Sequence, residues 1–446
     1  MPAQSRRSIA DLIARIKARL CRVGVIGLGY VGLPLALAAC RAGFSVIGFD
    51  TDEIRIAQVN RADSLMTHIP QAALHRAIEG GLFFATGDFD RLTEVDIIVI
   101  AVPTPLSRQR EPDLSFVIES TDAIARRLRR EQLIVLESTT WPGTTDEVMR
   151  PRLERSGLAS GVDFFLAFSP ERQDPGNPDF TASSIPKVVG GDGGDALDLA
   201  RAFYDELIVR TVPVSSPKTA EAVKLTENIF RAVNIALVNE LKVIYGKMGI
   251  DIWEVIEAAQ TKPFGFMPFH PGPGLGGHCI PIDPFYLTWK AREFDVTTRL
   301  IELAGQINTG MPHYVVDRVA EALDRRAHMG LSRAKLLLIG IAYKRNIDDM
   351  RESPALRLIA LLEERGATTD YHDPYIPTIP DEFGTIGGRR SVALSEAAIA
   401  TYDLVLIVTD HDAIDYNALA AAAKIVVDTR NACSRAGARG SHIVKA

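Results

Sequence analysis

The feature that most constrains this chain is a run of 18 uncharged residues, 23–40, near its N-terminus. A run of that length is compatible with a membrane span or with the core of a signal peptide. However, glycines crowd its first half, Pro34 interrupts it, and a second apolar stretch of strand length follows at 44–50. We therefore expect a strand, a glycine turn and a helix here, and no membrane span.

The glycines of this run form the pattern Gly-x-Gly-x-x-Gly at residues 27–32, between an apolar strand and a helical stretch. The first glycine allows a tight turn, the second lets a pyrophosphate approach the backbone, and the third lets helix and strand pack closely. Asp50 closes the next strand, 18 residues beyond Gly32, where a carboxylate accepts from ribose hydroxyls and repels a 2′-phosphate. We therefore predict NAD as the cofactor. The expected NAD-binding residues are Gly27, Gly29, Tyr30, Val31, Gly32, Asp50, Arg55, Thr104 and Thr139.

Thr104 and Thr139 are included because each follows an expected strand, at the carboxyl ends where ligands of parallel sheets bind. Taken alone, turn or helix-cap chemistry explains the two threonines slightly better.

Short apolar strands alternate with helical patterns in two separate blocks of the chain, which indicates two doubly wound parallel sheets. Long helical stretches and a loop rich in proline and glycine (261–284) lie between the blocks, and a helix is expected after Pro312. The expected strands are 22–27, 45–50, 95–101, 133–137 and 163–168 in the first block, and 335–343, 368–374, 403–410 and 424–431 in the second.

The predicted fold class is therefore α/β, with two Rossmann-like domains joined by a long central helix and a helical middle domain. The expected divisions are an N-terminal amphipathic helix (1–20), an NAD-binding domain (21–215), a central helical domain with a cysteine loop (216–325) and a C-terminal Rossmann-like domain (326–446). The basic N-terminal helix is compatible with an anionic membrane surface or, more commonly, with docking on its own protein or a partner subunit.

Composition excludes several classes of protein. A formal net charge of −6 disfavours a nucleic-acid-coating surface, and 47% hydrophobic residues argue against long disorder. The four cysteines (Cys21, Cys40, Cys279 and Cys433) are scattered without metal-binding spacing, so we expect no metal and a reduced, cytoplasmic protein.

Cys279 differs from the other cysteines because it follows two glycines, Gly276 and Gly277, where the backbone can approach a ligand. A nearby cation or helix N-terminus would make it a nucleophile, while a buried inert thiol is an equal alternative. Lys224 and Asn228 are spaced i, i+4 on the long helix and could stabilise an oxyanion. Glu171, after a strand, could transfer protons. A solvated surface is the simpler explanation of these three residues taken singly.

Together these residues stand in motifs that resemble the nucleotide-sugar dehydrogenase family, over about residues 20–435. The motifs are GLGYVGLP (27–34), ESTTWPGTT (137–145), SPERQDPGN (169–177), the Lys224/Asn228 pair, PGPGLGGHCIPIDPFYL (271–287) and GIAYKRNIDDMRESPA (340–355). The resemblance implies a four-electron oxidation of a sugar C6 alcohol to a carboxylate with two NAD, on a nucleotide sugar. It also implies a homodimer or larger homo-oligomer.

The resemblance further assigns roles to individual residues. Cys279 matches the thiol that captures the aldehyde, Lys224 and Asn228 the oxyanion and alkoxide stabilisers, and Asp283 and Thr139 the groups that position water. The expected catalytic set is Cys279, Lys224, Asn228, Asp283, Glu171 and Thr139, and the expected substrate-binding set is Glu171, Arg172, Lys224, Asn228, Gly276, Lys344 and Arg351. Lys344 and Arg351 match contacts to the diphosphate.

Departures from the family pattern bear on the substrate. Members that act on UDP-glucose tend to have Phe in place of Arg172 and Lys in place of Ile282. The chain is more similar to the branch that oxidises UDP-N-acetylhexosamines, and UDP-N-acetylglucosamine is the expected substrate. UDP-N-acetylmannosamine, UDP-glucose and GDP-mannose are alternatives. A two-electron hydroxyacid dehydrogenase and a nucleotide-binding regulator without catalysis are the alternatives from other classes.

Overall fold

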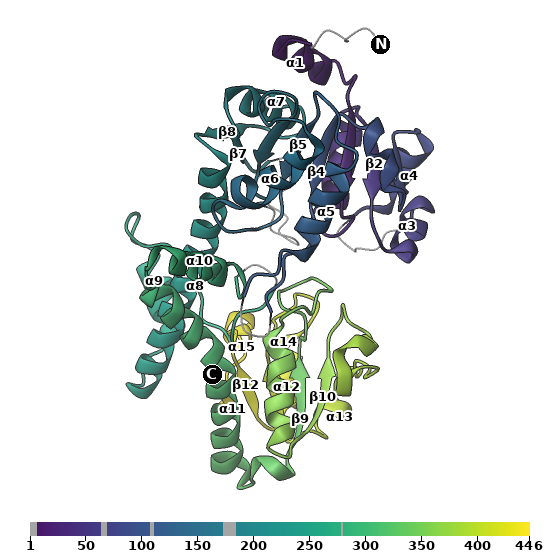
Figure 1. Cartoon of the computed structure of the whole chain (residues 1–446). Helices are drawn as coiled ribbons and strands as arrows, with labels where there is room; N and C mark the ends of the chain where they lie inside the picture. The colour runs from purple at the N-terminus through teal and green to yellow at the C-terminus, as the bar shows by residue number, and fades with distance from the viewer. Residues whose placement is uncertain (1–6, 64–68, 108–110, 173–183, 278–279) are drawn as a thin grey trace. The chain divides into compact units, whose positions relative to one another are not determined.

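The computed structural model describes residues 7–63, 69–107, 111–172, 184–277 and 280–446 (Figure 1). The chain divides into two compact units. The first comprises Met1–Glu227 with Phe285–Thr297, and the second comprises Asn228–Pro284 with Thr298–Ala446. None of the helices within the described ranges is long and apolar enough to cross a membrane.

The first unit contains an eight-stranded sheet in the order β3-β2-β1-β4-β5-β6-β7-β8. All neighbouring strands are parallel except β6 and β7, which are antiparallel. The strands are β1 (Arg22–Ile26), β2 (Ser45–Phe49), β3 (Phe83–Thr86), β4 (Ile97–Ile100), β5 (Leu133–Leu136), β6 (Phe165–Phe168), β7 (Lys187–Gly191) and β8 (Thr211–Val214). The helices are α1 (Ile9–Lys17), α2 (Gly32–Arg41), α3 (Glu53–Asn60), α4 (Gln71–Glu79), α5 (Ser115–Ala125), α6 (Arg150–Leu153) and α7 (Gly194–Tyr204), with short helices η1 (Phe89–Glu94), η2 (Thr145–Met149), η3 (Glu154–Ser156) and η4 (Arg292–Phe294).

The structure confirms the predicted doubly wound α/β class, and every strand expected in the first block forms. The middle strands β4, β5 and β6 are fully buried apolar runs, as expected for a parallel sheet covered on both faces. Sequence analysis missed β3, β7 and β8. The outer strands β3 and β8 alternate or carry a proline, and β7 reads Lys-Val-Val-Gly-Gly, so none of the three gives a strong apolar signal.

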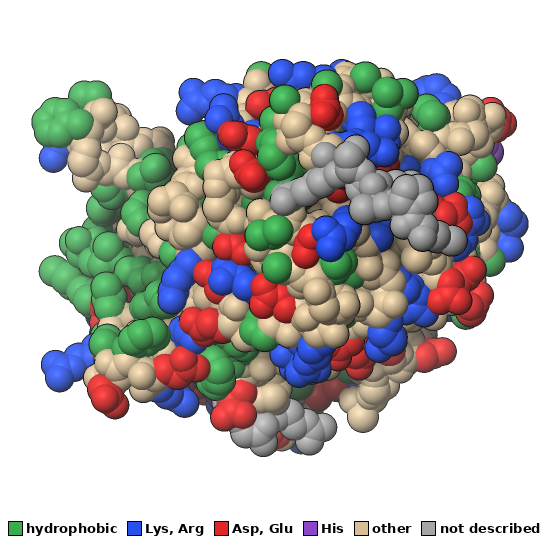
Figure 2. Space-filling model, turned by 45° about the horizontal axis from the view of Figure 1, so that its top comes forward, with side chains coloured by type: hydrophobic (Ala, Val, Ile, Leu, Met, Phe, Trp, Pro, Cys, Tyr) green, Lys and Arg blue, Asp and Glu red, His purple; other side chains and the backbone are tan. Residues whose placement is uncertain are grey.

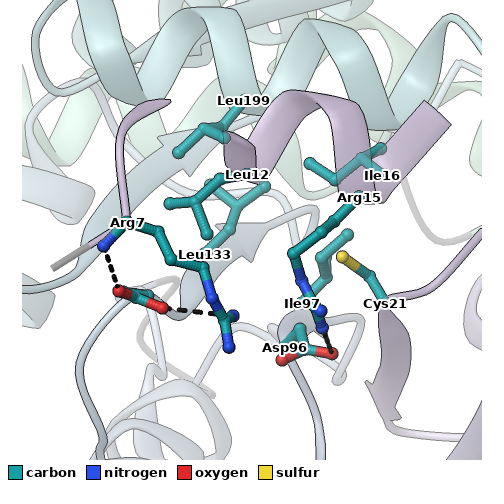
Figure 3. Close-up of a pocket in the computed structure, with 10 residues that line it drawn as sticks. Arg7, Leu12, Arg15, Ile16, Cys21, Asp96, Ile97, Leu133 and Leu199 are labelled. Carbon is teal, nitrogen blue, oxygen red and sulfur yellow. Dashed lines mark hydrogen bonds and ion pairs between the residues drawn. The ribbon is translucent and has the colours of Figure 1, made fainter. Parts of the chain in front are cut away.

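The N-terminal helix α1 docks on its own unit (Figure 3). Leu12 and Ile16 are buried in the same core as Leu199 of α7. Arg7 pairs with Glu131 at 3.3 Å, and Arg15 lies 3.9 Å from Asp96. The apolar face of α1 is therefore covered by protein.

The second unit contains a five-stranded, wholly parallel sheet in the order β10-β9-β11-β12-β13. Its strands are β9 (Lys335–Ile339), β10 (Thr368–His372), β11 (Leu404–Ile407), β12 (Val426–Asp428) and β13 (Ile443–Lys445). Alternate residues of β9 and β11 enter two cores, one shared with α11 and α12 and the other with α14 and α15. The sheet is thus covered on both faces, as the sequence predicts. The terminal strand β13, half-buried and three residues long, is not evident from the sequence.

Long helices precede this sheet. The helix α8 (Pro217–Lys247) begins in the first unit and continues into the second. The other helices after it are α9 (Ile252–Ala259), α10 (Asp283–Ala291), α11 (Arg299–Ala327), α12 (Pro354–Glu364), α13 (Glu396–Ile399), α14 (Tyr416–Ala422) and α15 (Ala432–Ala436), with short helices η5 (Leu331–Arg333) and η6 (Asp381–Ile386).

One expectation about these helices is wrong. The helix predicted to begin after Pro312 begins at Arg299 and passes through the proline. Proline removes one helical hydrogen bond, but burial of this segment outweighs the loss. Asn308, four residues earlier, is 2% exposed and bonds to α8 through the Asn239 amide and the Ala232 carbonyl.

The first sheet makes a tight turn after β1. The amide of Gly27 donates to the Phe49 carbonyl at 2.8 Å, and its φ is +92°. A Cβ at this position would lie 2.5 Å from the Ala101 carbonyl oxygen. The next amide, of Leu28, donates to Asp50 Oδ2 at 2.8 Å. Glycine is therefore required here by both conformation and space.

The second sheet makes the same turn after β9. The amide of Gly340 donates to the His372 carbonyl at 2.8 Å, its φ is +79°, and a Cβ would lie 2.2 Å from the Thr409 carbonyl oxygen. The next amide, of Ile341, donates to Asp373 Oδ2 at 2.7 Å. Each unit thus ends its first strand with a glycine and its second strand with an aspartate that accepts from the turn.

Candidate active site

The other two glycines of the 27–32 pattern, Gly29 and Gly32, have different surroundings. A Cβ on Gly32 would lie 1.8 Å from the Gly27 carbonyl oxygen, so helix α2 can start there only with glycine. A Cβ on Gly29 would have no heavy atom within 4 Å. The turn also lies where the strand order reverses between β1 and β4, the place at which such sheets bind nucleotides. Open space at Gly29 beside a helix N-terminus fits the pyrophosphate of a dinucleotide.

Asp50 stands at the end of β2 and is 6% exposed. Its carboxylate accepts from the amides of Leu28 at 2.8 Å and Asp52 at 3.0 Å, and Arg55 Nη1 lies 3.2 Å from Oδ2. Backbone amides and one guanidinium hold the carboxylate at the edge of the turn. This arrangement fits a ribose with free hydroxyls better than a phosphorylated ribose.

The two predicted threonine positions lie on loops that follow the adjacent strands β4 and β5. Ser138 Oγ ties these loops together, because it donates to the Val102 carbonyl at 2.7 Å and accepts from the Val102 amide at 3.0 Å. Thr139 is half-buried beside it, and Thr104 is buried. The structure thus places both threonines on loops leaving the same sheet edge as the glycine turn.

Lys224 and Glu171 are brought together in the first unit. Lys224, 9% exposed, donates from Nζ to the backbone carbonyl of Glu171. The Glu171 carboxylate is 3.7 Å from the ammonium of Lys187. The Ser169 hydroxyl donates to the Val188 carbonyl at 2.8 Å, which fixes the start of the loop. Two buried lysines therefore hold the short segment that presents Glu171.

Arg172, the adjacent predicted substrate contact, is occupied by other groups. Its guanidinium makes two bonds to Glu227 of α8, at 2.6 and 3.3 Å, and one to the Pro186 carbonyl at 2.6 Å. In this structure Arg172 therefore fastens the loop to α8.

Asn228 and Asp283 form a second buried pair, within the second unit. They are 4% and 3% exposed, and Asn228 Nδ2 donates to Asp283 Oδ2. Asp283 is the first residue of α10. The pair joins an amide and a carboxylate that sequence analysis had assigned to different tasks.

The glycine loop before Cys279 packs against the segment after β9. A Cβ on Gly276 would lie 2.7 Å from Tyr343 Cβ, and one on Gly277, with φ of +80°, would lie 2.7 Å from the Tyr343 ring. The Gly277 amide donates to the Arg351 carbonyl at 3.1 Å. Both glycines are thus needed for close approach. Cys279 itself, with His278, lies outside the described residues.

Cations gather at the carboxyl edge of the second sheet. Lys344 follows β9 and is half-buried, and Arg351 is paired with Asp349, with an Nη2–Oδ2 distance of 2.6 Å. Sequence analysis missed Arg430, which follows β12 and donates from Nε to the Val408 carbonyl at 2.9 Å. Burial lowers the pKa of Arg430. A cation two residues beyond the end of an apolar strand was the signal that could have identified it.

The three described cysteines are buried thiols. Burial raises the pKa of Cys21 to about 11 and those of Cys40 and Cys433 to about 12. Such thiols are poor nucleophiles at neutral pH. Within the part of the chain that the structure describes, no group of three or more acidic, histidine or cysteine side chains is placed to hold a metal.

A glycine turn of the dinucleotide-binding type in one sheet and cations at the carboxyl edge of a second sheet are typical of nucleotide-binding α/β proteins. Residues 21–208, 218–310 and 337–435 match the NAD binding, central and UDP binding domains of the UDP-glucose/GDP-mannose dehydrogenase family. The chain belongs to this family. It is an NAD-dependent oxidoreductase that acts on nucleotide sugars.

Several relatives share most of their length with the chain. UDP-N-acetyl-D-glucosamine 6-dehydrogenase of Pseudomonas aeruginosa is 38% identical over 358 residues, which are 80% of this chain and 83% of the relative. UDP-N-acetyl-D-mannosamine dehydrogenase of Salmonella typhi is 35% identical over 92% of this chain and 98% of its own. The structure of UDP-D-ManNAc dehydrogenase from Pyrococcus horikoshii superimposes with a TM-score of 0.85, at 32% identity over 95% of this chain and 98% of the other. These matches and the UDP binding domain exclude the two-electron hydroxyacid dehydrogenase.

Proposed function

We propose that the protein oxidises the C6 alcohol of a UDP-N-acetylhexosamine to the carboxylate, with UDP-N-acetylglucosamine as the preferred substrate. The observation that carries this proposal is the 38% identity, over four-fifths of the chain, to an enzyme named for that substrate. Relatives named for UDP-N-acetylmannosamine support the hexosamine class and leave the epimer to experiment. The uronate product would serve as a precursor of surface polysaccharide.

NAD supplies the hydride acceptor for each of two oxidations. In the proposed sequence the first oxidation converts the C6 alcohol to an aldehyde, with release of one hydride and one proton. The Cys279 thiolate adds to the aldehyde carbon to form a thiohemiacetal, and loss of a second hydride and proton leaves a thioester. Water then hydrolyses the thioester, which releases the carboxylate and restores the thiol.

Described residues would assist these steps. We assign oxyanion stabilisation to Lys224 and Asn228, water positioning to Asp283 and Thr139, and proton transfer to Glu171. The buried bond between Asn228 and Asp283 supports a shared task in orienting oxygen ligands. The substrate contacts proposed are Glu171, Arg172, Lys224, Asn228, Gly276, Lys344 and Arg351.

Substrate choice is tested by assays with NAD and each of UDP-N-acetylglucosamine, UDP-N-acetylmannosamine, UDP-N-acetylgalactosamine, UDP-glucose and GDP-mannose. We expect the highest kcat/KM with UDP-N-acetylglucosamine, two NADH for each product, and a uronate mass by mass spectrometry. NADH formation with UDP-glucose alone would refute the hexosamine proposal.

The covalent route is tested by Cys279→Ser. Complete turnover should disappear while NAD binding persists, because serine cannot form the thioester. Cys21→Ala is the matched control, since Cys21 is buried away from the glycine turn, and it should retain activity. Normal uronate production by Cys279→Ser would rule out the thioester.

We also propose that the protein forms a homodimer through an apolar stripe on α8 and α11. Phe230, Leu237 and Ile244 recur every seven residues on α8 and are 49%, 50% and 46% exposed, and Leu300 and Leu303 of α11 are 64% and 53% exposed. Figure 2 shows hydrophobic side chains gathered at its left edge, on the side where Figure 1 places α8 and α9. A seven-residue repeat of exposed apolar side chains suits helix packing against a second copy.

Sedimentation of wild type and Leu237→Glu tests this interface. The wild type should sediment as a dimer or larger assembly, and Leu237→Glu should shift it toward monomer. Ile54→Glu is the control, because Ile54 is 72% exposed in the first unit, outside the stripe. A monomeric wild type would refute the proposal.

A further inference from the structure

A buried ammonium group lies behind Glu171. Lys187 is the first residue of β7, and its side chain is 7% exposed. Its Nζ is 3.1 Å from Glu137 Oε2 and 3.7 Å from Glu171 Oε2, and it donates to the Pro170 carbonyl at 3.5 Å. One cation therefore contacts a buried carboxylate, the Glu171 carboxylate and the backbone that carries Glu171.

The other partner of Lys187, Glu137, is held in place by a hydrogen bond from α7. Its side chain is fully buried, and it accepts a hydrogen bond from the Tyr204 hydroxyl of α7. Burial raises the pKa of Glu137, and the charge of Lys187 opposes that shift. The Lys187 ammonium also lies 5.0 Å from the centre of the Tyr204 ring. Glu137 and Tyr204 thus give the ammonium a fixed position in the core.

The sheet topology explains why Lys187 reaches Glu171. β6 and β7 are antiparallel, with Phe168 opposite Gly190. Continued by three residues on each strand, that register places Glu171 opposite Lys187. The chain leaves β6 in the direction of Lys187, which agrees with the 3.7 Å distance between the Lys187 ammonium and the Glu171 carboxylate.

We propose that Lys187 is a positioning residue for Glu171, held in place by Glu137 and Tyr204. This inference rests on the proton-transfer role proposed for Glu171. Lys187 fixes the carboxylate by charge and the backbone by its bond to Pro170, so that Glu171 keeps one orientation toward the substrate. Its other partner, Glu137, stays in place whichever protonation state Glu171 takes.

Replacement of Lys187 tests the proposal. Lys187→Met should lower kcat at least tenfold while the Kd for NAD stays within twofold, because the glycine turn is untouched. Lys187→Arg keeps the cation and should restore most of the rate. Tyr204→Phe keeps the ring under the ammonium and removes one hydroxyl, so it should lower kcat less than threefold. NAD titration and thermal unfolding of each variant verify folding.

A double-mutant cycle separates positioning from a structural role. In a Glu171→Gln background, Lys187→Met should produce no further loss of kcat. If Lys187→Met slows both backgrounds equally, leaves the wild-type rate unchanged or weakens NAD binding in parallel, the positioning role is refuted. Should Lys187→Met fail to fold, Glu137→Gln replaces it in the same cycle, with an expected kcat loss of at least threefold that vanishes in the Glu171→Gln background.

The two proposals fail in different ways. Full activity of Glu171→Gln would refute the proton-transfer role and the positioning role together. A slow Glu171→Gln enzyme beside a fully active, folded Lys187→Met enzyme would refute the positioning role alone.

Discussion

The turns after β1 and β9 share a glycine, an aspartate and their hydrogen bonds, yet the residues that come after each turn differ. After Gly27 the first unit has Gly29 and Gly32, and α2 starts at once. The equivalent places after Gly340 hold Ala342 and Arg345, and the next helix, α12, begins only at Pro354. The first unit thus offers backbone amides and a helix N-terminus to a pyrophosphate, while the second offers cationic side chains. We propose that the same turn serves two ways of binding phosphates.

The aspartates that accept from the two turns, Asp50 and Asp373, also differ in their surroundings. Asp50 has Arg55 at its edge, whereas Asp373, 2% exposed, also accepts from the Ala342 amide at 3.0 Å and lies 3.1 Å from His411 Nε2. Burial alone would raise the pKa of Asp373, but the His411 bond and charge outweigh it and lower the pKa. The Asp373 carboxylate is therefore bonded on all sides by groups of the protein. The Asp50 carboxylate has fewer such partners and can still accept hydrogen bonds from a ligand.

Substitution of the first turn glycine, Gly27 in one unit and Gly340 in the other, should cause the largest loss of stability. Gly27→Ala and Gly340→Ala should each lower the free energy of unfolding by about 2–4 kcal/mol, because alanine meets both a positive φ and a carbonyl oxygen. Urea unfolding measures the loss, and hydrogen exchange assigns it to one unit. Gly29→Ala is the control: its Cβ meets open space, so it should weaken NAD binding without changing stability. Equal stability of all three variants would contradict the turn geometry.

The aspartates should separate ligand binding from stability. Asp50→Ala should weaken NAD binding by about 10–100-fold, or about 1.4–2.8 kcal/mol, and leave UDP binding unchanged. Asp373→Ala should instead lower the stability of the second unit by about 2–3 kcal/mol, because it leaves buried donors unpaired. Calorimetric titration with NAD and with UDP checks the first result, and an unchanged NAD affinity would remove Asp50 from the site.

Stability should depend on pH with opposite sign in the two units. Burial raises the pKa of Glu221 from 4.5 to about 7, so the first unit should lose about 3 kcal/mol as the pH rises from about 4.5 to 7. Burial, with Arg430 and Arg318 nearby, lowers the pKa of Lys242 to about 7, so the second unit should gain a similar amount between about pH 7 and 10.

Hydrogen exchange across this pH range, read separately in each unit, measures both trends. Glu221→Gln should flatten the first trend and Lys242→Met the second. Trends of the same sign in both units would contradict the assignment.

The smallest effect should come from the cationic edge. Lys344→Met should raise the KM for the UDP-sugar about tenfold, or about 1.4 kcal/mol, with little change in the KM for NAD, because the glycine turn proposed to bind NAD lies in the first unit and Lys344 in the second. Arg365→Met is the matched control, since Arg365 pairs on the surface with Asp317 at 3.0 Å. A parallel rise in the KM for NAD would mean that the two units do not divide the ligands in this way.

Sequence patterns were sufficient for the fold class and for the NAD turn. Both depend on local signals, namely apolar runs of strand length and glycines at fixed spacing, which Gly27, Gly32 and Asp50 satisfy. The second turn was missed because Gly340 lacks the following glycines, with Ala342 and Arg345 at the places that Gly29 and Gly32 take in the first turn. The Lys187 contacts were missed because they join Glu137, which follows β5, to β7 and the 169–172 loop, and no local sequence pattern encodes the antiparallel pairing of β6 and β7.

Other expectations remain predictions. The roles of the individual site residues, the domain limits 21–215, 216–325 and 326–446, and the cytoplasmic location are in this group. They depend on ligand contacts, on chemistry at Cys279 or on the cell, and none of these follows from strand and helix patterns.

The antiparallel pairing of β7 with β6 bears on how the segment between these strands can be engineered. A parallel pair needs a crossover that carries the chain back to the opposite end of the sheet, whereas an antiparallel pair returns at the end where it left. The segment from Glu171 to Lys187 therefore has both anchors at one end of β6 and β7. Changing the number of residues between these anchors would therefore not change the order of the strands in the sheet. Such a change would also leave the glycine turn after β1 intact, because that turn lies on another loop.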